Sequence, residues 1–257
     1  MRIGAQMYTV RDFCKDTKGL AETLKRIADI GYKTVQVSGT CPFDAEWLRN
    51  ELDKNGLECV ITHTPLDRIV NETEKVIEEH KVFGCKYIGL GCMPKYSEMT
   101  KETVDEFIAS ALPAAEKIGD AGCMFMYHNH AHEFDVKLDG VDGPILDYLA
   151  EKFPVGTMGF TLDTHWVKVG GYDPVEYLEK LKGRTPCVHF KDLVYDDEGK
   201  PKFAPVGSGL LDFDAIISAC ERLGVDYALV EQDDCYGRDP FECLKESYDY
   251  LKRKGLN

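Results

Sequence analysis

The strongest constraint on the fold is a phrase that recurs along the chain: a glycine, a few residues, and then a short run rich in β-branched, aromatic and other apolar residues. It appears as IGYKTVQVSG (30–39), NGLECVITH (55–63), FGCKYIGLG (83–91), AGCMFMYHNH (121–130) and LGVDYALVEQD (223–233). In the intervals, apolar residues return every three or four positions and predict helices, for example over 20–30, 45–55 and 73–83. The repeating unit is therefore a strand followed by a helix.

Three further apolar runs, at 3–8, 158–162 and 187–190, bring the predicted strands to eight. Short, continuously apolar strands that alternate with helices are typical of a parallel sheet buried on both faces. At 257 residues we predict one domain, residues 1–257, folded as a (β/α)8 TIM barrel. An open doubly wound sheet is the alternative, but it should carry a glycine-rich phosphate loop after its first strand, which GAQMYTVRD is not. The polar segment 195–209 is a candidate lid.

Composition narrows the partners and the compartment. The formal charge is −14, from 45 acidic and 31 basic residues, which disfavours a nucleic-acid partner. Ten cysteines without a CxxC pair indicate free thiols in a reducing cytoplasm rather than a disulfide framework. The first residues, MRIGAQMYTV, enter a strand-like pattern directly, so we expect neither a signal peptide nor a membrane partner.

Polar side chains gather where the predicted strands end. Six of the seven histidines, all except His80 and with His132 among them, lie at or next to these positions, which in a barrel form one mouth. Neutral imidazoles and carboxylates are the ligands that hold Zn²⁺, Mn²⁺ or Co²⁺ with positions left open for catalysis, and they predict a divalent metal site. The residues at the strand exits are Gln6, Tyr8, Gln36, His63, Gly91, His128, His130, Glu133, Asp163, His165, His189, Lys191, Glu231 and Asp233.

Four motifs at consecutive strand ends resemble a known family. YHNHAHEF, FTLDTHW, VHFKD and LVEQD are similar to the corresponding segments of the xylose-isomerase-like TIM-barrel superfamily, the sugar phosphate isomerases and epimerases, and in particular to a branch with a YHNHxxEF signature. The resemblance covers essentially the whole chain. It implies a single catalytic metal ion, Mn, Zn or Co with Mg as a further candidate, held by Asp163, His189 and Glu231 and by a fourth ligand from the fifth strand.

That fifth strand departs from the family pattern. His128 stands where the superfamily usually has a glutamate, and the nearest carboxylate is Glu133. The fourth metal ligand is therefore either Glu133 or His128. We favour Glu133, with His128 and His130 lining the substrate pocket, because these two histidines share one face of a strand while Asn129 points away.

The resemblance also implies a mechanism. A metal ion that chelates a carbonyl and its neighbouring hydroxyl stabilises an enediolate, and carboxylates on opposite sides act as base and acid. Glu133 and Glu231 are the expected pair. The absence of a phosphate loop and the scarcity of Arg and Lys at strand exits favour a neutral sugar. Further contacts to substrate, or proton transfer, are expected from His128, His130, His165 and Lys191, and the pocket walls from Tyr8, His63 and Trp166.

These expectations define one leading function and several alternatives. The leading one is a metal-dependent isomerase or epimerase acting on a keto-sugar, a small carbohydrate substrate. The same enediolate also serves a lyase or dehydratase, either inosose dehydratase-like or eliminating from a keto-glycoside. An endonuclease IV-like phosphodiesterase and a non-catalytic sugar-binding barrel are more remote. Assembly into a homo-oligomer stays open.

Overall fold

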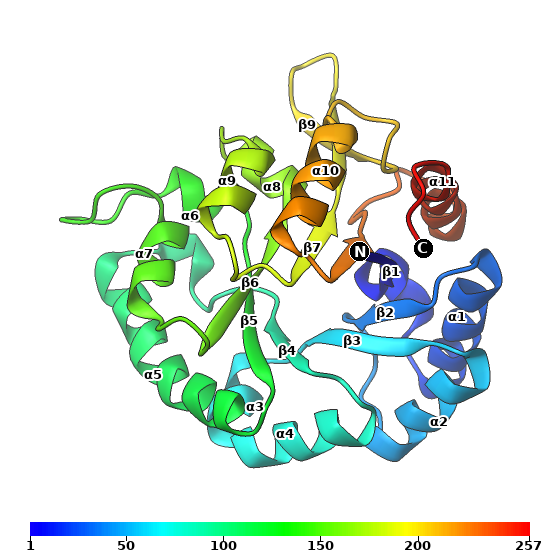
Figure 1. The fold of residues 1–257 in the computed structure, drawn as a ribbon, viewed down its shortest axis with the longest axis horizontal. Coiled ribbons are helices and arrows are strands. Elements are labelled where there is room, and N and C mark those ends of the chain that lie inside the picture. Colours follow the sequence, from blue (N-terminus) through cyan, green and yellow to red (C-terminus); the bar gives the residue numbers. More distant parts are fainter.

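A computed structural model describes all residues from 1 to 257 and contains a closed barrel of eight parallel strands (Figure 1). The predicted (β/α)8 barrel is confirmed, and each of the eight predicted strand segments contains a strand. In sequence order the barrel strands also follow one another around the barrel, and the last pairs with the first. They are β1 (Arg2–Gln6), β2 (Thr34–Val37), β3 (Glu58–His63), β4 (Tyr87–Leu90), β5 (Met124–His128), β6 (Met158–Asp163), β7 (Cys187–Phe190) and β10 (Tyr227–Val230).

Helices surround the barrel and cover the outer face of its strands (Figure 1). The helices predicted over 20–30, 45–55 and 73–83 correspond to α1, α2 and α4. Two short 3-10 helices, η1 (Met7–Phe13) and η2 (Tyr96–Glu98), lie among the connections. The α-helices are α1 (Thr17–Ile30), α2 (Ala45–Asn55), α3 (Leu66–Asn71), α4 (Thr73–Val82), α5 (Lys101–Asp120), α6 (His132–Asp135), α7 (Ile145–Lys152), α8 (Thr164–Val169), α9 (Pro174–Lys180), α10 (Phe213–Leu223) and α11 (Pro240–Arg253).

Local signals account for where several helices begin and end. The side chain of Asp44 accepts a hydrogen bond from the backbone N–H of Trp47 and so caps the start of α2, as Asp16 does for α1 through Gly19. Gly56 ends α2 in a left-handed conformation, with φ of 60°, which a residue without Cβ adopts at little cost. Polar caps and glycines thus delimit the helices that the periodicity predicts.

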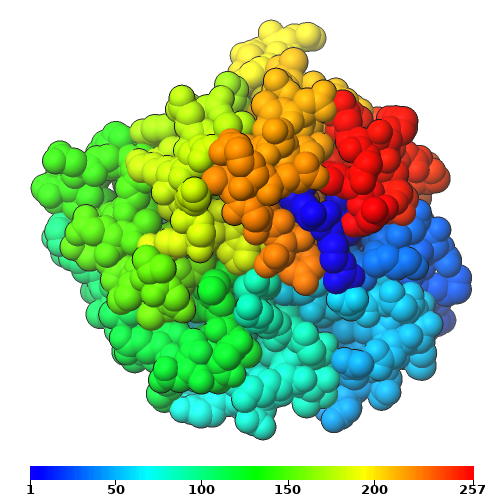
Figure 2. All heavy atoms as spheres, in the orientation of Figure 1, coloured from blue at the N-terminus to red at the C-terminus, as the bar shows by residue number.

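Burial matches the continuous apolar strands of the sequence. All four residues of β2, of β4 and of β7 are buried, because helices cover the outside of the barrel and side chains fill its inside. One cluster of 60 buried residues forms the main core. The first and last segments also meet: the N–H of Ile3 donates to the carbonyl of Asn257, and Figure 2 shows these ends side by side at the surface.

A two-stranded antiparallel hairpin of β8 (Asp192–Tyr195) and β9 (Pro201–Ala204) follows the seventh barrel strand. It includes much of the segment 195–209, and it protrudes from the rounded outline of the molecule (yellow in Figure 2). The backbone N–H of Phe203 donates to the hydroxyl of Tyr236 at 3.0 Å, which ties the hairpin to the segment after β10. The candidate lid is therefore a hairpin with a fixed attachment.

None of the helices combines the length and the apolar character needed to cross a membrane. All ten cysteines are free, and seven of them are buried. The buried ones pack as small apolar residues, and the predicted free thiols are present.

Candidate active site

Four side chains from four strand ends converge at the mouth of the barrel. His128 ends β5, Asp163 ends β6, His189 lies in β7 and Glu231 directly follows β10. One potential ligand atom from each lies within 4.8 Å of those of the others, and all four residues are at least 97% buried, with exposed fractions of 0–3%. The carboxyl ends of parallel barrel strands share one rim, which is why residues so distant in sequence meet.

His189 directs its Nδ1 at this group. Its Nε2 lies 2.6 Å from Oε1 of Gln36, an acceptor, so the neutral ring carries its proton on Nε2. Nδ1 is buried without a hydrogen-bond partner, 3.0 Å from Oε2 of Glu231 and 3.7 Å from Oδ2 of Asp163. The partner on the far nitrogen orients the ring as it does in metal-ligating histidines.

His128 has the same arrangement. Its Nδ1 lies 3.0 Å from the carbonyl oxygen of Gly91, and its Nε2 lies 3.2 Å from Oδ2 of Asp163. One nitrogen of each imidazole therefore faces carboxylate oxygens, an arrangement that is repulsive unless a proton or a metal cation lies between them. A divalent cation fits this donor set, because two imidazole nitrogens and two carboxylates are ligands for Zn²⁺, Mn²⁺ and Co²⁺.

The surrounding charges act on the pKa values of the group. Burial opposes the protonated form of His189, but Glu231 and Asp163 outweigh it and raise its pKa to about 8. Burial would raise the pKa of Asp163, yet Lys191 and the neighbouring histidines hold it well below its usual range. The carboxylates are consequently ionised, as ligands for a cation must be.

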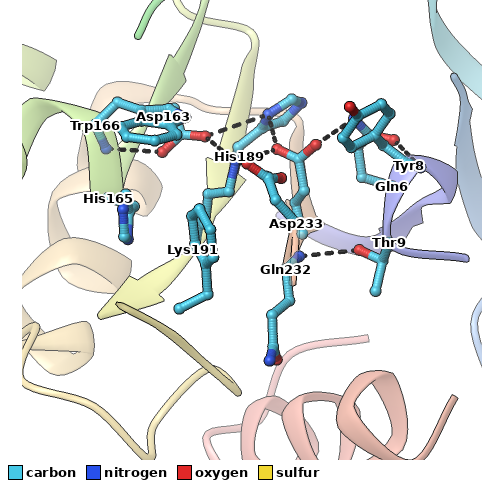
Figure 3. Close-up of polar contacts among 12 residues, drawn as sticks. Gln6, Tyr8, Thr9, Asp163, His165, Trp166, His189, Lys191, Gln232 and Asp233 are labelled. Atoms are coloured by element: carbon cyan, nitrogen blue, oxygen red, sulfur yellow. Dashed lines mark hydrogen bonds and ion pairs between the residues drawn. The ribbon is translucent and has the colours of Figure 1, made fainter. Parts of the chain in front are cut away.

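Lys191 is the internal cation of the site. Its side chain is 1% exposed, and its Nζ lies 2.8 Å from Oδ1 of Asp233, 3.0 Å from Oε2 of Glu231 and 3.3 Å from Oδ2 of Asp163 (Figure 3). Burial disfavours the charge, but these three carboxylates raise the pKa of Lys191 above its usual value. Lys191 is therefore a buried, paired cation and not a solvated surface lysine.

Asp163 and Glu231 are each fixed by further hydrogen bonds. Oδ1 of Asp163 accepts from the backbone N–H of Trp166 at the start of α8 (Figure 3). The backbone N–H of Asp163 donates to Oδ1 of Asn129. Oε1 of Glu231 accepts from Nε2 of Gln6 at 2.6 Å. Each carboxylate thus keeps one oxygen directed at the shared centre while protein donors hold the other.

Glu133, the favoured fourth ligand of the sequence analysis, lies outside the four-residue group. Its Oε1 accepts from the hydroxyl of Tyr127 at 2.5 Å and its Oε2 from the backbone N–H of His130 at 2.7 Å. The residue is fully buried in the short helix α6. The structure places His128, the alternative, at the centre instead, because the turn after β5 directs the Glu133 carboxylate back against its own strand.

A cavity of about 330 Å³ opens onto the centre. His63 borders it, with Nδ1 3.0 Å from the hydroxyl of Ser38 and Nε2 buried without a partner. Burial lowers the pKa of His63 well below its usual range, so its ring is neutral. The volume falls in the range of small-molecule sites. The lining residues are Tyr8, Ser38, Gly39, His63, Gly91, Cys92, His128, His130, Lys191, Glu231 and Asp233.

Among the residues predicted to contact substrate, His165 and Trp166 do not border this cavity. His165 is 1% exposed, its Nδ1 lies 3.3 Å from the carbonyl oxygen of Asp192, and its ring stacks on Phe203 at 4.5 Å. Trp166 packs against His165 and stands beneath Lys191, whose Nζ is 5.2 Å from the centre of the indole ring. Both form a layer of packing behind the site.

The structure adds residues to which the sequence analysis gave no role. Gln36 orients His189, and Asp233 pairs with Lys191. Burial and the adjacent Glu231 raise the pKa of Asp233 to about 6. A polar residue near the end of an apolar strand, as in TVQV, marks such a position in the sequence. The sequence does not show which side chain that polar residue will contact.

Comparisons with known proteins agree with this architecture. The family model of the xylose isomerase-like TIM barrel matches residues 24–254. Inosose dehydratase of Lacticaseibacillus casei is 26% identical over 265 residues, covering 86% of this chain and 85% of that protein. Inosose dehydratase of Geobacillus kaustophilus is 25% identical over 273 residues, covering 90% and 86%.

Among solved structures, a sugar phosphate isomerase/epimerase from Parabacteroides distasonis superposes with a TM-score of 0.81 at 22% identity and covers 98% of both chains. At this identity the likeness concerns the fold. The family match extends over most of the sequence and includes the β5, β6, β7 and β10 ends that carry the four converging side chains. The chain belongs to the xylose isomerase-like TIM barrel family.

Proposed function

We propose that the protein is a divalent-metal-dependent enzyme that removes a proton beside the carbonyl group of a keto-sugar or cyclic keto-polyol. The observation that carries this proposal is the convergence of His128, Asp163, His189 and Glu231, with one nitrogen of each imidazole turned toward the carboxylates. An ion bound there supplies a Lewis acid that stabilises the negative charge developing on the carbonyl oxygen. The small cavity and the lack of a phosphate loop favour a neutral carbohydrate as substrate.

The residues of the chain supply the proton transfers. Glu231 is the base in this proposal, since it borders the cavity while Gln6 and Lys191 position its two oxygens. Lys191 is the acid: it remains protonated among three carboxylates and also borders the cavity. Asp233 fixes the direction of the ammonium group at 2.8 Å. A base and an acid within one small cavity are the requirement for removing a proton and protonating a leaving oxygen.

The combination of one carboxylate base, Glu231, with one ammonium acid, Lys191, favours elimination of water. A pair of carboxylates on opposite sides of the substrate, expected as Glu133 and Glu231, suits proton return to carbon, but Glu133 is held by Tyr127 and a backbone N–H. Glu231 and Lys191 instead form one base and one acid. In dehydration Glu231 takes the proton from carbon, the C–O bond at the neighbouring carbon breaks, and Lys191 protonates the leaving hydroxyl. The inosose dehydratases among the relatives support the same choice.

Isomerisation or epimerisation is the second candidate. His63, from β3, borders the same cavity with a neutral ring whose buried Nε2 has no partner. Such a nitrogen is able to accept a proton and return it to carbon at a different position from Glu231. If this transfer outpaces loss of the hydroxyl, the outcome is an isomerase or epimerase acting on a keto-sugar.

Turnover in deuterated water distinguishes these outcomes. Metal-free protein is reloaded with Mn²⁺, Co²⁺ or Zn²⁺ and incubated with an inosose and a set of ketohexoses, and the products are followed by NMR and mass spectrometry. Dehydration gives a product lighter by one water, whereas isomerisation conserves the carbon skeleton and hydroxyls and introduces carbon-bound deuterium. We expect Asp163→Asn to abolish both reactions. The proposal is contradicted if chelator-treated protein turns over substrate as fast as metal-loaded protein. It is also contradicted if no substrate exchanges a carbon-bound proton with any of the three metals.

A further inference from the structure

A second group of metal-ligating side chains lies beside the first and shares no residue with it. It consists of Cys92, just after β4, and of His130 and His132, in the turn between β5 and α6. One potential ligand atom of each lies within 4.8 Å of those of the other two, and all three side chains are partly exposed. Ions can therefore reach the group from solvent.

The local contacts hold these side chains together and leave one nitrogen of His130 without a partner. Sγ of Cys92 lies 3.9 Å from Nε2 of His132, and the rings of His130 and His132 are nearly parallel, with centres 5.2 Å apart and 13° between their planes. The ring of Tyr96 stacks on the ring of His132, with the ring centres 5.4 Å apart. Nδ1 of His130 is buried and has no hydrogen-bond partner. A buried nitrogen without a partner is costly unless a ligand satisfies it.

Glu133 fixes the geometry of this turn. Its Oε2 accepts from the backbone N–H of His130, and its Oε1 lies 3.1 Å from Nε2 of His132. The hydroxyl of Tyr127 holds the same carboxylate from the strand side. The negative charge of Glu133 therefore lies beside the three candidate ligands and favours a cation among them.

We propose that Cys92, His130 and His132 bind a second metal ion, with Zn²⁺ the preferred one. A thiolate and two imidazoles form a softer donor set than the two imidazoles and two carboxylates of the first centre, and they suit Zn²⁺ or Co²⁺ better than Mg²⁺ or Mn²⁺. Three protein ligands leave one position of a tetrahedral ion open. Because Cys92 and His130 both border the 330 Å³ cavity, the open position is accessible to an oxygen of the bound carbohydrate.

The ion also has a structural consequence. Cys92 belongs to the connection after β4, whereas the two histidines belong to the connection after β5. An ion shared between them joins two neighbouring loops of the barrel mouth and stabilises the native state by mass action. It would hold this part of the rim in place whether or not the first centre is loaded.

Cobalt titration of metal-free protein tests the second site directly. A thiolate ligand gives Co²⁺ a near-ultraviolet charge-transfer band that imidazole and carboxylate ligands do not give. We expect this band in the wild type, with two ions bound per chain, and its loss in Cys92→Ser together with one of the two ions. Cys41→Ser, which removes another partly exposed cysteine, is the matched control and should keep the band. Absence of the band in the wild type, or its persistence in Cys92→Ser, overturns the proposal.

A second pair of variants separates this inference from the proposed function. Asp163→Asn combined with Glu231→Gln removes the first centre, and the cobalt–thiolate band should remain. His132→Gln should lose the band while one ion still binds. Circular dichroism verifies that each variant is folded, and Zn²⁺ should raise the melting temperature of the double variant but not when Cys92→Ser is added. Loss of the band in the folded double variant would mean that the thiolate site does not exist independently.

Discussion

The Nε2–H of His189 donates to Oε1 of Gln36 across 2.6 Å, joining β7 to β2 through the barrel. This hydrogen bond fixes the neutral tautomer of His189 and leaves its Nδ1 directed at Glu231, 3.0 Å away. Gln36 itself is fully buried. The orientation of a candidate metal ligand thus depends on a residue that lies 153 positions earlier in the chain.

Replacing Gln36 with leucine should weaken metal binding at the first centre by about 10- to 100-fold, the usual effect of removing the partner of a ligating histidine. The free ring would no longer favour the tautomer with a lone pair on Nδ1. Calorimetric titration with Mn²⁺ measures the affinity. Gln232→Leu is the control, because Gln232 is also a buried glutamine but bonds only to the carbonyl of Asp234 through its side chain. Equal affinities for the two variants would disprove the role of Gln36.

Substitutions of His128 and Glu133 decide which residue is the fifth-strand ligand. His128→Ala should abolish stoichiometric Mn²⁺ binding, since it removes one of four converging donors. Glu133→Gln should retain Mn²⁺ binding but lower the free energy of unfolding by about 1.5–3 kcal/mol, because an amide replaces a buried charged acceptor of two hydrogen bonds. Titration and urea unfolding measure the two quantities. Loss of Mn²⁺ binding in Glu133→Gln, with binding retained in His128→Ala, would identify Glu133 as the ligand.

Lys191→Met separates catalysis from metal binding. Removing the proposed acid should lower kcat by about 10²- to 10⁴-fold while the protein still binds its metal ion. The metal-free variant should also lose about 3–5 kcal/mol of stability, because Asp163, Glu231 and Asp233 lose their common cation.

Steady-state kinetics and urea unfolding measure these effects, with Lys202→Met as control. Lys202 pairs with Asp196 at 3.8 Å, and both side chains are more exposed, so this change should cost less than about 1 kcal/mol. Unchanged kcat in Lys191→Met would remove the lysine from the mechanism.

His80 predicts a pH dependence of stability away from the site. It is buried in α4, with Nε2 2.8 Å from the hydroxyl of Thr62 and Nδ1 2.7 Å from the carbonyl oxygen of Val76, and burial lowers its pKa to about 4. An unfolded histidine has a pKa of about 6.5, so between these values the unfolded state binds more protons. The contribution of His80 to the free energy of unfolding is complete above pH about 6.5. It falls by roughly 1.4 kcal/mol per pH unit as the pH is lowered toward about 4.

Urea unfolding of the wild type and His80→Gln, both in a chelator, checks this expectation. The advantage of the wild type over the variant should be largest near neutral pH and should shrink as the pH falls toward about 4. A difference that does not change with pH would show that protonation of His80 is not coupled to unfolding. Substitution of the partly exposed His132 is unsuitable as a control because this residue belongs to the proposed second metal site.

The barrel could be predicted because its information is local. Runs such as TVQV and CVHF are rich in apolar residues and carry a polar one near the mouth, and they become β2 and β7, buried on both faces. Asp44 and Gly56 mark the two ends of a helix whose apolar periodicity is visible in the sequence. Strand, helix and turn signals agree with one another in each repeat, and a parallel, closed barrel buries all eight strands at this length.

By itself the sequence determined the repeating unit, the eight strands and the rim on which Asp163, His189 and Glu231 stand, since the exits of parallel strands must share one end of a barrel. Only the tertiary structure decided that His128 rather than Glu133 completes the group and that Cys92 meets His132. The reason is physical. Periodicity specifies the face from which a side chain leaves its strand, whereas the direction of a carboxylate or imidazole in a turn depends on hydrogen bonds to partners far away in the chain.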